Sequence, residues 1–236
     1  MRRCLIIVAK EPAVGRTKTR LAAGVGAIWA LELYRSFLLD TLDQARHIKD
    51  CTLAFSFWPP EAAPSFRALY VPALLLPQRG EDFGSRLLSA FEQASKHDFD
   101  QMVLIGSDNP SLPRSYVEQA FAALDEHETV LGPSTDGGYY LIGMRRPQPA
   151  LFHRGIAWST EVVAEQTRDA ATANTIGMTL IPPWYDIDTA ADLRLLYRDL
   201  VRQPTICVAP RTREVLAEMA DSQFADLLEL EEARPF

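Results

Sequence analysis

Short apolar runs alternate with longer segments of helical periodicity along most of this 236-residue chain. The runs at 4–9, 51–57 and 101–108 have the length and the nearly continuous apolar content of strands that are buried on both faces. Parallel strands need a long crossover between them, usually a helix, so strand–helix–strand order is typical of a mainly parallel sheet with helices on both faces. The sequence therefore predicts an α/β fold.

The other expected elements follow from the same periodicities and from the turn residues between them. We expect strands at 4–9, 51–57, 70–77, 101–108, 129–133, 138–144 and 175–183 and helices at 27–46, 83–96, 113–124, 159–170 and 189–200. Pro72 and Pro77 favour a short or edge strand at 70–77, since proline cannot donate to a sheet ladder. Ser159 can cap one helix, and Thr189 with Asp192 resembles a capping box that opens the last one.

The end of the chain differs in charge from the rest. Seven acidic residues and no Lys or Arg lie between positions 214 and 232, where apolar residues could pack one face of a helix. We interpret residues 201–236 as an acidic C-terminal helical extension, and residues 1–200 as the main α/β domain. A solvated face explains the acidic charge most simply, and the binding of a partner is the alternative.

Composition argues against several classes of protein. With 24 Lys and Arg against 31 Asp and Glu, the net charge is −7, whereas general nucleic-acid binders are normally basic. The 3 cysteines lie far apart without a CxxC pair, which argues against a zinc cluster or a disulfide framework. No apolar run approaches the roughly 20 residues that span a bilayer, and the run at 4–9 is too short for a signal peptide. We expect a cytoplasmic protein without a nucleic-acid partner or an integral membrane segment.

A cluster of cations stands out against this acidic background. It surrounds a Pro/Gly loop just after the first strand, and ligands of open α/β sheets bind at the C-terminal ends of such strands. Neighbouring cations repel one another, so the loop predicts a phosphate site, although neither the P-loop nor the GxGxxG pattern occurs there. The nucleotide-binding residues expected here are Ala9, Lys10, Pro12, Gly15, Arg16, Lys18 and Arg20. The alternative is a group of solvated loop charges.

Two later turns carry carboxylates directly after strands. Asp108 follows the strand at 101–108, and Asp186 and Asp188 follow the strand at 175–183. Carboxylate oxygens are hard ligands that suit Mg²⁺ or Mn²⁺, so we expect Asp108 and Asp188 to hold a divalent ion that faces the basic loop. For Asp188 the alternative is a cap at the start of the following helix.

Two further turns could bind the rest of a substrate. In the turn at 132–143, Asp136 precedes Gly137 and Gly138, which let an acceptor or sugar approach the backbone, with Asp136 as a base or hydrogen-bond acceptor. The alternative is an ordinary hairpin tip. Trp158 either lines the acceptor side or lies in the core.

The polar turn at 76–87 is the second of these. Gln78 could read a base or ribose edge through its amide, while Gly80 and Gly84 flank Asp82, and Arg86 could add a phosphate contact. A plain loop explains the same residues equally well.

Five motifs taken together resemble a known bacterial family. They are K-x-P-x-x-G-x-x-K-T-R-L at 10–21, P-Q-x-G-x-D-x-G-x-R at 77–86, G-S-D-x-P at 106–110, G-P-x-x-D-G-G-Y-Y-L-I-G at 132–143 and D-I-D-T-x-x-D-L at 186–193. The chain resembles GT-A-like nucleotide-diphospho-sugar transferases or glycosyltransferases of unknown substrate, the rSAM/selenodomain-associated transferase 1 group. It is more remotely similar to the phospholactate and molybdenum-cofactor guanylyltransferases. The resemblance covers about residues 4–200 and implies a Rossmann-like GT-A fold with a divalent ion.

The sequence departs from the pattern of these relatives at two turns. The mid-chain turn reads S-D-N, where glycosyltransferases usually have D-x-D, and Ala190–Ala191 replace a Pro-Glu pair that relatives often carry. The resemblance implies that Lys10, Gly15, Lys18 and Arg20 contact phosphates and that Asp108 and Asp188 hold the metal. We expect Lys18, Asp108 and Asp136 to be the catalytic residues.

Two transfer reactions fit these residues. One is glycosyl transfer from a nucleotide-diphospho-sugar to a small-molecule acceptor. The alternative is transfer of a nucleotidyl group from a nucleoside triphosphate to a phosphorylated acceptor. A non-catalytic nucleotide-binding module is a third reading, and a homodimer is compatible with all three.

Overall fold

The computed structural model describes residues 1–69, 73–202, 208–222 and 224, which fall into two compact units. The sheet unit comprises residues 1–11, 44–107 and 112–186, and the helical unit comprises residues 12–43 and 108–111 together with the described residues from 187 onward. Each unit is therefore assembled from three separate stretches of the chain. The division into residues 1–200 and 201–236 that the sequence suggests stays a prediction.

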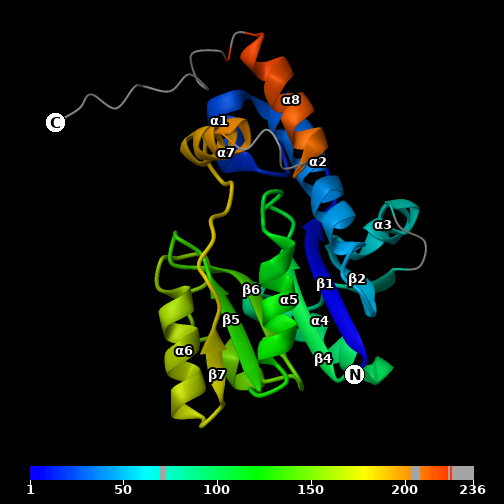
Figure 1. Ribbon diagram of the computed structural model, residues 1–236, viewed down its shortest axis with the longest axis vertical. Helices are drawn as coiled ribbons and strands as arrows, with labels where there is room; N and C mark the ends of the chain where they lie inside the picture. The colour runs from blue at the N-terminus through cyan, green and yellow to red at the C-terminus, as the bar shows by residue number, and fades with distance from the viewer. Residues whose placement is uncertain (70–72, 203–207, 223, 225–236) are drawn as a thin grey trace, which may run out of the picture. The chain divides into compact units, whose positions relative to one another are not determined.

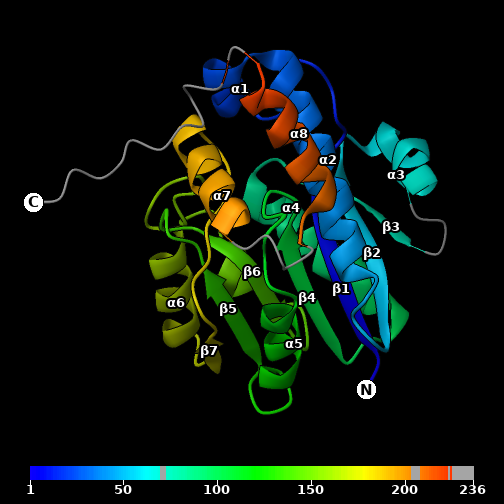
Figure 2. The same cartoon turned by 45° about the horizontal axis from the view of Figure 1, so that its top comes forward.

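Strands occur at all seven expected places in one sheet, whose order is β3-β2-β1-β4-β6-β5-β7 (Figures 1 and 2), and positions 70–72 of the strand expected at 70–77 lie outside the described residues. The strands are β1 (Arg3–Lys10), β2 (Cys51–Trp58), β3 (Leu74–Pro77), β4 (Gln101–Gly106), β5 (Thr129–Pro133), β6 (Tyr139–Met144) and β7 (Met178–Leu180). The pairs β1–β2, β1–β4, β2–β3 and β5–β7 are parallel, and β6 runs antiparallel to both β4 and β5. The predicted α/β fold with a mostly parallel, Rossmann-like sheet is confirmed.

The last strand is shorter than its apolar run suggests. β7 covers only Met178–Leu180 of the expected 175–183. Ile181 still donates its N–H to the carbonyl of Leu131, at 3.0 Å. Pro182 and Pro183 follow, and because proline has no N–H they cannot extend the ladder.

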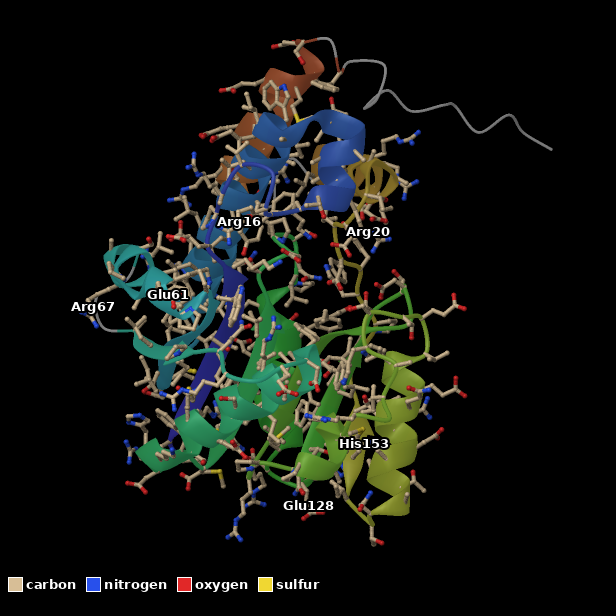
Figure 3. The ribbon with its side chains drawn as sticks, turned by 180° about the vertical axis from the view of Figure 1, so that it is seen from behind. Arg16, Arg20, Glu61, Arg67, Glu128 and His153 are labelled. Carbon is tan, nitrogen blue, oxygen red and sulfur yellow. The ribbon has the colours of Figure 1, made fainter. Side chains whose placement is uncertain are left out.

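Helices cover both faces of the sheet, as expected. The helices of this unit are α3 (Ala63–Leu69), α4 (Phe83–Ala94), α5 (Arg114–Ala123) and α6 (Val163–Ala173), with short 3₁₀ turns at η1 (Pro60–Ala62), η2 (Ser95–His97) and η3 (Pro149–Phe152). Leu87 and Phe91 of α4 and Ala170 of α6 join a buried cluster with Ile6 and Leu104 of the sheet. α5 lies on the opposite face from α4 (Figures 1 and 3). Burial of both faces explains the continuous apolar runs in the central strands.

The start of α6 differs from the expectation. The sequence places a cap at Ser159, but Ser159 has φ +65°, and the helix begins at Val163 without a side-chain cap. Residues 158–162 form turns and a bend instead. The expectation that Ser159 caps this helix is therefore wrong, because the chain turns through a left-handed residue before the helix can start.

The helical unit contains α1 (Thr19–Val25), most of α2 (Ala27–Ala45), α7 (Ala190–Arg202) and α8 (Pro210–Ala220). Figures 1 and 2 show α1, α7 and α8 gathered around the first part of α2. α1 has no counterpart among the predicted helices. It approaches α7 closely at Gly24, where an added Cβ would lie 2.8 Å from the Cβ of Ala190. A glycine suits that contact because a Cβ at position 24 would collide with the methyl group of Ala190.

α8 is held by one buried carboxylate. The side chain of Asp40 in α2 is 0% exposed and accepts hydrogen bonds from the N–H of Thr212 at 2.8 Å and from its hydroxyl at 2.7 Å. It also accepts from the N–H of Arg211 at 3.2 Å. Asp40 therefore satisfies the free N–H groups of the first turn of α8, which have no acceptor within the helix itself. Within the extension expected at 201–236, a helix occurs over Pro210–Ala220, and positions 203–207, 223 and 225–236 lie outside the described residues.

The predicted capping box at the start of α7 is confirmed. Asp192 Oδ2 accepts from the N–H of Thr189 at 2.7 Å and from its hydroxyl at 2.8 Å. Replacing Thr189 by valine removes the hydroxyl but keeps the shape of the side chain. We expect the free energy of unfolding to fall by about 1 kcal/mol, which urea denaturation can measure. A Thr189→Ser variant, which keeps the hydroxyl, should lose less, and equal losses would show that the cap does not stabilise α7.

None of the helices in the described part of the chain combines the length and the apolar character that a membrane crossing requires.

Candidate functional site

The helical unit brings together one lysine and the two carboxylates that the sequence singles out. Lys18 Nζ lies 2.8 Å from Asp108 Oδ2 and 2.8 Å from Asp188 Oδ1. The same ammonium donates a hydrogen bond to the carbonyl oxygen of Ile187, at 2.6 Å. We call these three acceptors, Asp108 Oδ2, Asp188 Oδ1 and the Ile187 carbonyl, the oxygen cage.

The backbone positions both the oxygen cage and the lysine that it surrounds. Asp108 lies just beyond β4 in the chain, and its carbonyl accepts from the N–H of Ile187 at 3.3 Å, which joins the two acidic turns. Lys18 stands immediately before α1 with φ +51° and ψ +46°. A left-handed lysine costs roughly 1 kcal/mol, and such strain persists only where the surroundings hold the residue in place. Here three acceptors hold its side chain.

Burial and charge act together on Lys18. Its side chain is 5% exposed, whereas those of Asp108 and Asp188 are 37% and 38% exposed. Burial alone would lower the pKa of Lys18, but the charges and hydrogen bonds of Asp108 and Asp188 outweigh it, so that its pKa lies above the ordinary value. Lys18 therefore carries its charge at neutral pH.

Asp188 interacts with two cations and does not cap α7. Burial raises the pKa of Asp188, but Lys18 and then Arg20 lower it more, so the net shift is downward. Arg20 Nη1 lies 3.3 Å from Asp188 Oδ2, and its side chain is 71% exposed. The hydroxyl of Thr189 accepts from the N–H of Asp192 at 3.4 Å and so fills the capping position, which makes the alternative reading of Asp188 as a helix cap wrong.

The loop before α1 is ordered by its own hydrogen bonds. The N–H of Ala13 donates to the hydroxyl of Thr17 at 3.2 Å, and the N–H of Arg16 donates to the carbonyl of Ala13 at 3.2 Å. Gly15 has φ +70° and nothing within 4 Å of an added Cβ, so its backbone is open on that side. Figure 3 marks Arg16 in this loop and Arg20 in α1. Pro12, Gly15, Arg16, Lys18 and Arg20 thus share the helical unit with Asp108 and Asp188, whereas Ala9 and Lys10 end β1 in the sheet unit.

The other predicted nucleotide residues lie in the polar turn before α4. Gln78 is 5% exposed and its amide donates to the carbonyl of Ser56 at 3.0 Å, which is a structural contact. Gly80 has φ +132°, so only glycine is comfortable there. Asp82 accepts from the N–H of Ser85 at 2.7 Å and caps α4. This hydrogen bond, with help from the Ser85 hydroxyl and nearby arginines, holds the pKa of Asp82 below its usual value. Binding roles for these residues stay predictions.

The predicted acceptor residues are joined to this turn within the sheet unit. An added Cβ on Gly84 would lie 2.3 Å from the ring of Trp158, so the ring packs directly on the backbone of α4. Trp158 also stacks on Phe152, with 6.4 Å between ring centroids and 9° between planes. Its aromatic neighbours agree with the core reading, although the ring is only half-buried.

The turn at 136–138 packs against the segment that follows Trp158. Gly137 has φ +89°, and an added Cβ would lie 1.9 Å from the carbonyl oxygen of Glu161. Asp136 Oδ1 accepts from the N–H of Gly138 at 3.0 Å, which shapes the turn. The structure therefore places Asp136, Gly137, Gly138 and Trp158 in the sheet unit, where Gly137 packs on Glu161 and Trp158 packs on Gly84.

Comparison with known proteins assigns the chain to a family. The sequence profile of a family described as uncharacterized proteins conserved in bacteria (DUF2064) matches residues 41–160, half of the chain. The chain belongs to the DUF2064 family. No curated protein matches it significantly.

Solved structures resemble this DUF2064 member over most of its length. A crystal structure from Desulfovibrio desulfuricans G20, named as a candidate nucleotide-diphospho-sugar transferase, has 31% identity and a TM-score of 0.85 and covers 96% of each chain. The inositol-1-phosphate CTP transferase of T. maritima has 15% identity and a TM-score of 0.52, covering 93% of this chain and 97% of its own.

A third neighbour is the CMP:2-keto-3-deoxy-manno-octonic acid synthetase in complex with CTP. It has 13% identity and a TM-score of 0.55, with 86% and 99% of the two chains covered. This enzyme and the one from T. maritima share the fold with the DUF2064 chain. The relative with 31% identity confirms the expected enzyme class, a transferase.

The oxygen cage fits a divalent ion that is completed by a substrate. The described residues contain no group of three or more His, Cys, Asp or Glu side chains placed to hold a metal. The cage offers two carboxylates and one carbonyl, and Asp108 Oδ1 is a further oxygen that is buried without a hydrogen-bond partner. Mg²⁺ is typically bound by one or two carboxylates, with water and phosphate oxygens filling the remaining positions. The donor set therefore suits an ion that arrives with a polyphosphate.

Two groups that take part in these arrangements were not predicted from the sequence. The Ile187 carbonyl completes the oxygen cage, but main-chain atoms leave no signal in a sequence. Arg154 lies 2.9 Å from Glu81 Oε2 and 4.0 Å from Asp82 Oδ2, and so ties the segment before Trp158 to the polar turn. A lone arginine in a turn gives no indication of such a partner.

Proposed function

We propose that this chain is a metal-dependent transferase whose donor is a nucleotide-diphospho-sugar. The oxygen cage carries this proposal, because three convergent hard oxygens beside an otherwise basic loop suit a divalent ion together with a polyphosphate. The related protein of Desulfovibrio desulfuricans G20, named as a candidate nucleotide-diphospho-sugar transferase, supports this choice of donor.

The site residues of the helical unit have distinct proposed roles. Asp108 and Asp188 hold Mg²⁺ or Mn²⁺, which when bound neutralises the negative charge that develops on the departing diphosphate. Arg20, whose side chain is exposed, binds phosphate oxygens, and Lys18 does so once its ammonium is released from Asp108 and Asp188. The open backbone at Gly15 and the exposed Arg16 serve the same polyanion.

We assign the acceptor side to Asp136, Gly137, Gly138 and Trp158. One oxygen of Asp136 shapes its own turn, and the residue is exposed, so its remaining lone pairs are available to a hydroxyl. Asp136 would then accept the proton of the acceptor hydroxyl or hydrogen-bond a sugar. The nearby glycines keep this turn free of side chains.

Nucleotidyl transfer is the second candidate. Its support is the neighbouring pair of Lys18 and Arg20, which suits a triphosphate, and the fold shared with two CTP-using enzymes. In that reaction a phosphorylated acceptor attacks the α-phosphorus and pyrophosphate leaves. The same residues would hold the leaving group in both reactions.

A thermal-shift panel tests the proposal. UDP-, GDP-, ADP- and TDP-sugars and the four nucleoside triphosphates are each measured with Mn²⁺ and with EDTA. We expect one nucleotide-sugar at about 100 times its Kd to raise Tm by roughly 5–10 °C with Mn²⁺ and little with EDTA. A shift confined to a triphosphate would favour nucleotidyl transfer. A shift with no product formed from any acceptor would indicate a binding module, and a shift unchanged by EDTA would contradict metal dependence.

A further inference from the structure

Lys18 occupies the place that a divalent ion would take. An ammonium has three N–H donors, and those of Lys18 face three acceptors, at 2.6 Å for Ile187 and 2.8 Å for each of the two aspartates. Carboxylate and carbonyl oxygens of this kind are also the ligands of Mg²⁺, which they approach to about 2.1 Å. Since one point cannot hold both cations, the ammonium and a metal ion exclude each other from the oxygen cage.

The same geometry conflicts with a phosphate role for Lys18 in this state. Its side chain is 5% exposed, and its donors are directed at the protein, so none remains for a phosphate oxygen. Lys18 can bind a polyphosphate only after it leaves the cage. If Lys18 left without a replacement, Asp108 and Asp188 would face each other with only the exposed Arg20 beside Asp188, and the loss of the buried cation between them would be costly.

We propose that Lys18 and a divalent cation are alternative occupants of the oxygen cage, and that Lys18 becomes a phosphate ligand when the cation takes its place. This inference rests on the proposed function, since it concerns the same site. In the metal-free protein, Lys18 is then the counter-ion of both carboxylates. Lys18 is then free for the donor only when the metal is present, so that metal and polyphosphate bind with positive coupling.

Labelling of lysine amines in the wild-type protein tests the exchange directly. Reductive methylation followed by peptide mass mapping is carried out without metal, with Mn²⁺ alone, and with Mn²⁺ and inorganic pyrophosphate. We expect Lys18 to be protected without metal, to react at least about fivefold faster with Mn²⁺ as its exposure rises, and to be protected again by pyrophosphate. The exposed Lys49 provides the internal reference and should keep one rate throughout. A rate for Lys18 that Mn²⁺ leaves unchanged overturns the exchange.

A matched pair of variants supplies a second, independent measurement. Lys18→Met removes the cage occupant, and Arg20→Met removes the same charge from a side chain that is 71% exposed and contacts Asp188 Oδ2, outside the cage. Binding of Mn²⁺ alone is followed by electron paramagnetic resonance. We expect Lys18→Met to bind Mn²⁺ at least about tenfold more tightly than wild type, and Arg20→Met no more than about threefold more tightly. Equal gains would show a general effect of charge and would overturn the exchange.

The two hypotheses fail in different ways. If neither nucleotide-sugars nor triphosphates bind with Mn²⁺, the proposed function fails, whatever Lys18 does. If a nucleotide binds in a metal-dependent manner while Lys18 stays protected in the presence of Mn²⁺, the function stands and the exchange is wrong. Since labelling uses the wild-type protein, a variant that fails to fold does not affect this decision.

Discussion

Replacing Asp108 by asparagine is expected to lower the rate of transfer by about a hundredfold to a thousandfold. Asparagine keeps the size of the side chain but removes its negative charge. Asp108 provides one oxygen of the cage and a second, buried oxygen without a partner, so the substitution removes half of the carboxylate charge available to a divalent ion. We therefore expect the Mn²⁺ concentration required for half-maximal rate to rise as well.

The measurement uses the donor that gives the largest thermal shift and follows release of the nucleotide product against Mn²⁺ concentration. Asp98→Asn is the matched control, because Asp98 is 91% exposed and its left-handed backbone suits asparagine equally. The control should retain the wild-type rate. Full activity of the Asp108→Asn protein at low Mn²⁺ would remove Asp108 from the catalytic residues.

Asp40→Ala is expected to destabilise the helical unit by about 3 kcal/mol. The side chain of Asp40 is fully buried and accepts from the N–H groups of Arg211 and Thr212 and from the Thr212 hydroxyl. It is also paired with the Arg211 guanidinium at 3.3 Å. Alanine leaves these donors buried without an acceptor, so α8 loses the group that fixes its first turn to α2.

Urea denaturation monitored by circular dichroism measures this loss. Glu218→Ala is the control, since Glu218 lies on the same helix but is exposed. Its effect should stay within about 0.5 kcal/mol. If Asp40→Ala costs no more than Glu218→Ala, Asp40 does not anchor α8, and the helix must be held by its apolar residues such as Leu216 and Met219.

The fold could be predicted because its strongest signals lie within single segments of the sequence. β1, β2 and β4 are interior strands in which consecutive residues are buried, so their apolar runs are long enough to be recognised by length alone. α2 was expected because its apolar residues recur at helical spacing, and α7 because Thr189 and Asp192 form the pattern of a capping box. In both cases the signal lies within one segment.

The elements that were predicted wrongly or not at all depend on contacts between distant parts of the chain. α1 contains a glycine, which weakens a helical pattern, yet Gly24 is needed where this helix meets Ala190. α6 starts later than expected because Ser159 takes a left-handed turn next to Trp158, whose ring packs on Gly84. No local pattern distinguishes such a contact from an ordinary cap.

The sequence by itself determined the α/β architecture, the Pro/Gly loop with its cluster of cations, the two acidic turns and the capping box of α7, because each depends on the order of residues within a short segment. Only the tertiary structure decided that Lys18, rather than any of the other cations of the loop, sits between Asp108 and Asp188. Lys18 and Asp188 are 170 positions apart, and the Ile187 carbonyl has no side-chain signature at all. These groups come together because the folded backbone joins the turns at 108 and 187 through the hydrogen bond between Ile187 and Asp108. The spacing of residues along the chain does not encode this proximity in space.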